Sequence, residues 1–262
     1  MTRSRTFSLG LAAALTLLAA DAAASAGKKD GGTPTTRRLV KGVYEIKLGD
    51  DVIGKESFTE RVLSNNTIVY TCEYEVRRVG RVGGRLGAAL AGETRLEADE
   101  DSRFPRSYYT KKVEKTEKEE RVEELEAELF ANVLVSRRKS GDGTESTTTV
   151  VLPTGSLLVE QNIAHQLAVL VDRYRVSDGG KQAFNAFEPS MGRTLPAAVE
   201  YIGPAPATES GDKSGLEHYK FYVGNSPGGD LYVDAESRII RRVVTFQKVL
   251  YELTSLEIQG DE

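Results

Sequence analysis

The decisive stretch is IVYTCEYEV, residues 68–76, in which apolar or aromatic side chains occupy every second position. A two-residue period of this kind is typical of a β-strand with one buried face. Cys72 has the same parity as Tyr70 and Tyr74, so we expect a buried thiol, because an unpaired cysteine packs as a small hydrophobe. The fold is therefore expected to grow from a sheet around this strand.

Two further strands are predicted on the N-terminal side. Residues 39–48 carry apolar side chains of one parity, and Gly49-Asp50-Asp51 form a turn. A second strand runs through Ile53 and Phe58, and Ser64-Asn65-Asn66 turn the chain into the decisive strand. Alternating runs separated by short polar turns are typical of an antiparallel meander.

Residues 111–129, on the C-terminal side, carry two conflicting signals. Their many Glu and Lys residues favour a helix. Leu125, Ala127 and Leu129 alternate with glutamates, however, which is the pattern of a half-buried strand. The strand-like flanks favour the second interpretation, and the sequence alone leaves both open.

One helix is predicted, over residues 162–175. Its apolar residues recur at the i, i+4, i+7, i+8 and i+11 positions, and they are Ile163, Leu167, Leu170, Val171 and Tyr174. They form a single stripe, as in a helix that lies on a core with its other face in water. We therefore expect Leu167 to be central to the core, and Val169 and His165 to face solvent.

We predict that the remaining chain forms further strands, and their length indicates the fold class. The last strand runs from Arg238 to about Tyr251, far longer than an average strand. Long, bent strands are typical of strongly curved sheets. The prediction is a mainly β fold: a curved antiparallel sheet, open or a half barrel, with one packed amphipathic helix. A two-sheet β-sandwich is the alternative.

The first 26 residues have the order of features of a cleavable signal peptide. Arg3 and Arg5 precede an apolar run over residues 9–20, and Ala24-Ser25-Ala26 supply small residues for cleavage. An uncut anchor is the alternative, but the apolar run is shorter than the ~20 residues that span a bilayer. We expect an exported protein, periplasmic or extracellular, with no integral membrane segment after cleavage. Residues 27–38 form a flexible leader, and residues 39–258 a single β-rich domain.

Composition disfavours several classes of partner and cofactor. The chain has 35 basic and 39 acidic residues, for a formal net charge of −4, so no nucleic-acid partner is expected. Cys72 is the one cysteine, which precludes an intrachain disulfide. The spacing of its cysteine and two histidines fits no metal site, so we predict no metal and no cofactor.

The sequence predicts a binding protein and not an enzyme. His165 and His218 are its two histidines, and no Gly-x-Ser-x-Gly motif is present. A hydrolase acting on envelope material is the alternative, because the members of a catalytic triad need not be close in sequence. The aromatic residues expected to line an apolar or lipid-like ligand are Tyr70, Tyr74, Phe184 and Phe187.

Several glycine turns and strand ends resemble those of a family of proteins. They are Gly42-Val43-Tyr44-Glu45-Ile46, Gly49, Ile53-Gly54-Lys55-Glu56, Phe104-Pro105-Arg106-Ser107-Tyr108-Tyr109, Leu231-Tyr232-Val233-Asp234 and Arg238-Ile239-Ile240. The chain resembles the uncharacterised, exported, mostly β domains of unknown function of Gram-negative bacteria. It is also similar in style to the periplasmic lipoprotein carriers, whose curved sheet holds acyl chains over a helix. That resemblance implies an apolar ligand between sheet and helix.

Overall fold

The structure, a computed structural model, describes residues 33–77, 89–116, 119–160, 163–189, 191–206, 215–224 and 226–260. Residues 1–32, which hold the predicted signal peptide and the first part of the leader, lie outside these ranges. Thr36–Glu262 form one compact unit. Its first strand begins at Thr36, three residues before the predicted start of the domain, because Arg38 already pairs with Val62 and Gly260 on the two neighbouring strands.

The described residues form one sheet of fifteen strands. The strands are β1 (Thr36–Leu48), β2 (Asp51–Leu63), β3 (Thr67–Arg77), β4 (Ala89–Asp99), β5 (Pro105–Lys115), β6 (Glu120–Phe130), β7 (Val133–Ser140), β8 (Glu145–Val151), β9 (Leu157–Leu158), β10 (Lys181–Glu188), β11 (Arg193–Pro204), β12 (Leu216–Val223), β13 (Ser226–Asp234), β14 (Ile240–Thr245) and β15 (Val249–Gly260).

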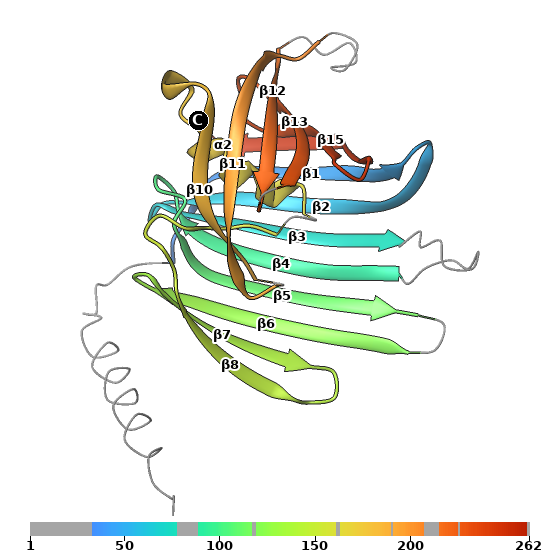
Figure 1. Cartoon of the computed structure of the whole chain (residues 1–262), viewed down its shortest axis with the longest axis vertical. Helices are drawn as coiled ribbons and strands as arrows, with labels where there is room; N and C mark the ends of the chain where they lie inside the picture. The colour runs from blue at the N-terminus through green and yellow to red at the C-terminus, as the bar shows by residue number, and fades with distance from the viewer. Residues whose placement is uncertain are drawn as a thin grey trace, which may run out of the picture. The chain divides into compact units, whose positions relative to one another are not determined.

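Almost every strand pairs with its neighbours in the sequence. The order runs from β8 down to β1, then from β15 down to β9, so β1 and β15 pair in the middle. All pairs are antiparallel except β9 with β10. The sheet curves until β10 to β13 cross over β1 to β5, yet β8 and β9 stay unpaired with each other (Figure 1). The prediction of an open, curved antiparallel sheet is confirmed, and the sandwich alternative is wrong.

Within residues 111–129, residues 111–115 belong to β5 and residues 120–129 to β6. β5 and β6 pair from Ser107 with Glu128 to Lys115 with Glu120. Leu125 and Ala127 are buried while Glu126 and Glu128 are exposed, and the Lys111 ammonium lies 3.3 Å from the Glu124 carboxylate on the outer face. The alternation therefore prevails over the local helix propensity of Glu and Lys, because burial of one face outweighs a small intrinsic preference.

Residues 156–160 and 163–174, which we call the internal segment, lie inside the curved sheet. Residues 156–160 and 163–171 are all buried. The segment contains β9, a 3₁₀ turn at His165–Leu167 and the helix α2 at Ala168–Arg173, and a second 3₁₀ turn follows at Val176–Asp178. The predicted single helix over 162–175 is thus a short helix preceded by a tighter turn.

Two predictions about the helix faces are wrong. Val169 is 0% exposed and His165 is 4% exposed, although both were expected to face solvent. The sheet contacts the segment from several sides: Phe58 of β2 stacks on His165, and Tyr219 of β12 contacts Tyr174. A single apolar stripe describes a helix that lies on one surface. It does not describe a helix that the sheet surrounds.

Gly42 on β1 leaves room for an aromatic ring. A Cβ atom at this position would lie 2.4 Å from the Phe58 ring, closer than any normal contact. The Phe58 ring lies parallel to the His165 imidazole, with ring centroids 4.0 Å apart. The position of the 3₁₀ turn at His165 therefore depends on the absence of a side chain at residue 42 on β1.

Candidate functional site

Two cavities flank the internal segment at opposite ends of β1 and β2. The larger, which we call the apolar cavity, has a volume of about 840 Å³ and is lined by Ile46 and Ile53, among other residues. The smaller, which we call the arginine cavity, measures about 290 Å³ and contacts Arg38 and Glu60. Ligand pockets commonly measure about 300–1,000 Å³, so the apolar cavity has the size of a binding site for an organic molecule.

The wall of the apolar cavity comes from inward positions of the sheet and from the internal segment. Its apolar and aromatic lining residues are Ile46, Leu48, Ile53, Tyr74, Val76, Leu90, Ile163, Val249 and Tyr251. Ile46 and Leu48 on β1, and Tyr74 and Val76 on β3, are alternate residues of their strands. Side chains of alternate residues lie on the same face of a strand, so each pair points into the cavity. A register shift in the β1–β2 pairing near Ile46 brings Ile53 to the same face as Glu56.

Charged residues also line the apolar cavity. They are Arg77, Lys112, Glu114, Arg121, Glu123 and Glu160. Glu160 is buried, accepts a hydrogen bond of 3.1 Å from the Tyr108 hydroxyl, and lies 3.6 Å from the Lys112 ammonium. Burial raises the pKa of Tyr74 well above its usual range, so the phenol on this wall stays neutral. An apolar wall beside charged groups suits a molecule with one apolar and one polar end.

Glu56 anchors the start of the 3₁₀ turn between the two cavities. The carboxylate is fully buried and accepts hydrogen bonds of 2.8 Å from the backbone N–H groups of Ala164 and His165. These donors have no partner within a helix, so a buried acceptor satisfies them. Burial raises the pKa of Glu56 to about 7, while the two N–H groups and the Cys72 thiol oppose that shift. Cys72 is buried, as predicted.

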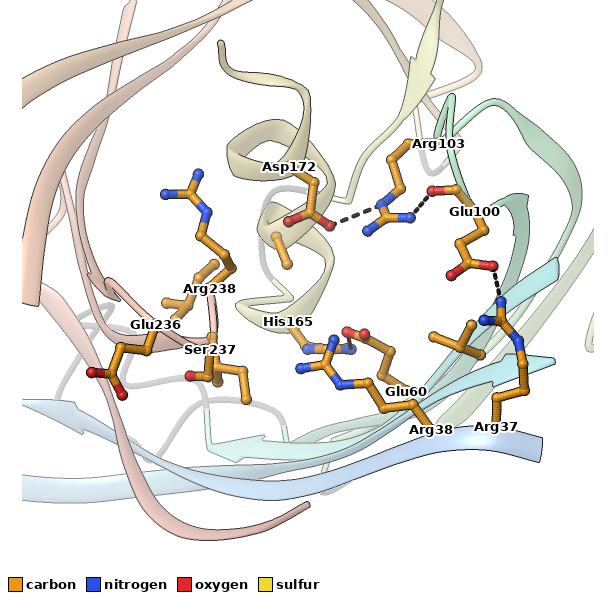
Figure 2. A pocket seen from close by; sticks show the side chains of 14 residues that line it. Arg37, Arg38, Glu60, Glu100, Arg103, His165, Asp172, Glu236, Ser237 and Arg238 are labelled. Atoms are coloured by element: carbon orange, nitrogen blue, oxygen red, sulfur yellow. Dashed lines mark hydrogen bonds and ion pairs between the residues drawn. The ribbon is translucent and has the colours of Figure 1, made fainter. Parts of the chain in front are cut away.

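Salt bridges cross one side of the arginine cavity (Figure 2). Arg103 donates to Asp172 of the helix at 2.9 Å and also to the backbone carbonyl of Glu100. The Glu100 carboxylate in turn pairs with Arg37. These contacts attach the end of α2 to the turn between β4 and β5.

Arg238 holds the helix from the turn between β13 and β14. Its guanidinium donates to the Val171 carbonyl at 3.2 Å, to the Tyr219 hydroxyl at 2.8 Å and to the Glu217 carboxylate at 2.9 Å. A cation at the last carbonyls of a helix satisfies their unpaired oxygens. The two arginines Arg103 and Arg238 thus fix α2 from two sides.

His165 lies in the wall of the arginine cavity as a neutral imidazole. Phe58 and Tyr70 enclose its ring, and burial lowers its pKa to about 3. Its Nε2 atom lies 3.9 Å from a Glu60 carboxylate oxygen, which is too long for a hydrogen bond. The prediction of a solvated His165 is wrong because the sheet covers the face of the segment that the helical stripe left open.

His218 occupies a different environment on β12. Its Nε2 atom lies 2.8 Å from an Asp230 carboxylate oxygen, and its ring stacks on Tyr232 with centroids 4.9 Å apart. Within the described ranges, no serine hydroxyl forms a hydrogen bond with either histidine. Ser237 lines the same cavity as His165 without bonding to it.

The four predicted ligand residues are not brought together. Tyr74 lines the apolar cavity, and Tyr70 is buried beside His165. Phe184 is half-buried and Phe187 is buried, both within the core around β10. Three of the four therefore lie away from the cavity that fits a ligand.

Sequence reasoning missed the charged groups that face inward from β2. Glu56 and Glu60 share their parity with Phe58 and Val62, which are buried apolar residues. Their parity in the sequence places these two carboxylates at inward positions of the strand, and that pattern would have predicted buried charged groups. In the part of the chain that the structure describes, no three His, Cys, Asp or Glu side chains are grouped closely enough for a metal ion. None of the helices described there has the length and hydropathy needed to cross a membrane.

The chain shares its fold with a solved structure. No protein-family model matches it, and no curated protein matches it. It is similar to the crystal structure of a β-barrel-like protein of the domain of unknown function DUF1849 from Brucella abortus, with a TM-score of 0.56. The match covers 87% of this chain and 100% of the other at 12% sequence identity. At that identity the likeness shows only that the two proteins share a mostly β fold. The function of the other domain is unknown.

Proposed function

We propose that this chain is a non-catalytic binding protein that takes an apolar or lipid-like ligand into the apolar cavity. The cavity itself carries the proposal: about 840 Å³, walled by aliphatic and aromatic side chains of the curved sheet and by Ile163 of the internal segment. Burial of apolar ligand surface contributes roughly 25 cal/mol per Å². A cavity of this size and composition therefore favours a hydrocarbon chain or ring over a polar metabolite.

The charged lining residues favour an amphiphile over a pure hydrocarbon. Arg77 and Arg121 are exposed at the cavity, while Lys112 is half-buried beside Glu160. Glu114, Glu123 and Glu160 line the same cavity, so a ligand with a tail against Ile46 and Tyr251 could place a polar head of either charge near these groups without burying an unpaired charge. Burying an unpaired charge would cost far more than the tail gains per methylene.

We also propose that the protein acts after export, in the periplasm or outside the cell, as a ligand carrier or a support of the envelope. The support for this location is the order of Arg3, Arg5, the apolar run over residues 9–20 and Ala24-Ser25-Ala26. The alternative, a hydrolase acting on envelope material, needs a serine hydroxyl within reach of a histidine that also contacts a carboxylate. His218 has the carboxylate contact with Asp230, and the described residues place no serine hydroxyl against it.

A cavity-filling variant tests the binding function. A fluorescent fatty-acid analogue is titrated into the purified chain, and lipids carried through a native purification are extracted and identified by mass spectrometry. Val76→Trp places an indole in the cavity from β3 and is expected to weaken probe binding at least about tenfold, since it takes up the space of the tail.

Ile258→Trp is the matched control, because Ile258 is exposed on β15 away from the cavity. Its probe affinity should equal that of the unmodified chain. Equal affinity in all three proteins, together with empty lipid extracts, would mean that no apolar ligand enters this cavity.

A further inference from the structure

The arginine cavity contains buried polar atoms that the described residues leave without a partner. They are the Arg38 Nε, the His165 Nε2 and the Ser237 Oγ atoms. The Ser237 hydroxyl also lies near the Asp234 carboxylate, so Arg38 and His165 are the stronger pair. A buried polar group without a hydrogen bond costs about 1–3 kcal/mol. Three such groups in the lining of one small cavity indicate that a bound species satisfies them.

Three separate parts of the chain bring these atoms to the cavity (Figure 2). Arg38 has the inward parity of Val40 on β1, His165 begins the 3₁₀ turn, and Ser237 belongs to the turn between β13 and β14. The His165 side chain is 5% exposed, so its ring is held in place by Phe58 and Tyr70. The site is therefore assembled by the fold and does not depend on one surface side chain.

All three atoms can donate a hydrogen bond. An Arg Nε–H donates only, a serine hydroxyl donates or accepts, and a neutral imidazole carries its proton on one of its two nitrogens. The other cations of the cavity are already engaged: Arg37 with Glu100, Arg103 with Asp172, and Arg238 with Glu217. The described residues place no acceptor within hydrogen-bond distance of the Arg38 Nε, His165 Nε2 and Ser237 Oγ atoms.

Four carboxylates line this cavity and oppose an anion: Glu100 pairs with Arg37, Asp172 pairs with Arg103, Glu236 is exposed, and Glu60 faces Arg38. Glu60 is the one closest to the proposed donors. It is faced by Arg38 from β1, by Arg103 from the turn between β4 and β5, and by His165 and Asp172 from the internal segment. Burial and the charge of Asp172 raise the pKa of Glu60 to about 7. A protonated Glu60 adds no negative charge and becomes a further donor.

We propose that the arginine cavity is a binding site for a small oxyanion, a sulfate, a phosphate or the phosphate of a soluble ester, held by Arg38, His165 and Ser237. The guanidinium fork matches the geometry of two oxyanion oxygens, which strengthens and orients the contact. A volume of about 290 Å³ holds such an ion with several waters, each of which occupies about 30 Å³. This site is separate from the apolar cavity and does not depend on the apolar ligand.

Calorimetric titration of the purified chain with sodium sulfate tests the proposal, at constant ionic strength set with sodium chloride. Sulfate is the first probe because its charge does not change near neutral pH. Arg38→Gln removes the donor and the charge and is expected to weaken sulfate binding at least about tenfold, and Ser237→Ala about threefold or more. Arg95→Gln is the matched control, since the Arg95 side chain is half exposed, pairs with Glu97 on β4 and does not line this cavity. It should bind sulfate as the unmodified chain does.

Glu60→Gln sharpens the test, because it removes the opposing carboxylate while keeping the shape of the side chain. It should tighten sulfate binding, and it keeps the proposal testable if Arg38→Gln does not fold. Inorganic phosphate and glycerol phosphate, titrated in parallel, separate a free ion from an ester as the source of the group; binding of either supports the site. The proposal would be overturned if none of the three anions gave heat beyond that of sodium chloride, or if the Arg38 and Arg95 variants bound sulfate equally well.

Discussion

At one end of β1 and β2 the inward side chains are Ile46 and Ile53, and at the other end they are Arg38 and Glu60. The same two strands thus line an apolar cavity and a charged one. Between the two cavities, Phe58 packs against His165, and Glu56 binds the backbone of the 3₁₀ turn.

The difference shows how the internal segment is held. On the apolar side it contributes Ile163 to a wall. On the charged side it is fixed by directional contacts, from Arg103 to Asp172 and from Arg238 to the Val171 carbonyl. We infer that apolar packing buries the internal segment and that the hydrogen bonds fix its position within the curved sheet. The four predictions below test this division, from the largest expected effect to the smallest.

Val169→Lys should prevent folding. Val169 is 0% exposed in α2, so the substitution buries an unpaired ammonium group, which costs more than a domain's whole stability margin. Urea unfolding followed by circular dichroism measures the effect. Val176→Lys, at a position that is 54% exposed just after the helix, is the control and should change stability by less than about 0.5 kcal/mol. Similar stabilities for both variants would contradict a buried helix.

Leu167→Ala should cost about 2–5 kcal/mol of unfolding free energy, the range for a buried leucine reduced to alanine. Leu167 is among the largest fully buried side chains of the core. The same urea titration measures it. A cost below about 1 kcal/mol would mean that packing contributes little to holding the segment, and that the polar contacts dominate.

Stability should fall by a net of about 3 kcal/mol between pH 5 and pH 8. The pKa of both Glu56 and Glu60 rises from 4.5 in the unfolded chain to about 7 in the folded one. The folded state therefore binds more protons between these values, and stability decreases as pH rises through them. His165 acts in the opposite direction, because its pKa is lowered from 6.5 to about 3, so it reduces stability as pH falls below 6.5.

The midpoint of urea unfolding at pH 5, 6.5 and 8 measures this dependence. In Glu60→Gln the fall should shrink to less than half, since one of the two raised carboxyl groups is gone. A midpoint that rises steadily from pH 5 to pH 8 would show that these carboxylates are not buried as described.

Glu56→Gln should destabilise the chain by about 1–3 kcal/mol, because an amide oxygen replaces only one of two acceptors for the N–H groups of Ala164 and His165. Glu126→Gln, at an exposed outer position of β6, is the control and should have little effect. Equal effects of the two substitutions would show that Glu56 does not help to position the internal segment.

The parity of side chains along a strand could be predicted from the sequence, and the partners of a strand could not. Cys72 and Leu125 are buried, as their alternation indicates. The helical stripe identified Leu167 correctly and failed for Val169 and His165. A period shows which side chains point the same way, but only the surrounding sheet decides whether the opposite side meets water.

The cavities were harder to predict for the same reason. The apolar cavity combines Ile46, Tyr74 and Tyr251, residues of β1, β3 and β15. Phe184 and Phe187 have equally suitable side chains and lie in the core around β10. Which aromatic residues meet is decided by the pairing of β1 with β15, a contact between distant parts of the sequence that no local pattern reveals.

That pairing also has a consequence for the order of folding. Residues 36–48 cannot complete the sheet until residues 249–260 have been synthesised, so we expect the hairpins of β2 to β8 and of β10 to β14 to form first. The seam between β1 and β15 then closes a loop of most of the chain, which is entropically slow. A circular permutant that joins these strands through a short linker and is cut within residues 152–156 would have only sequential neighbours, and its sheet should form without the slow closure.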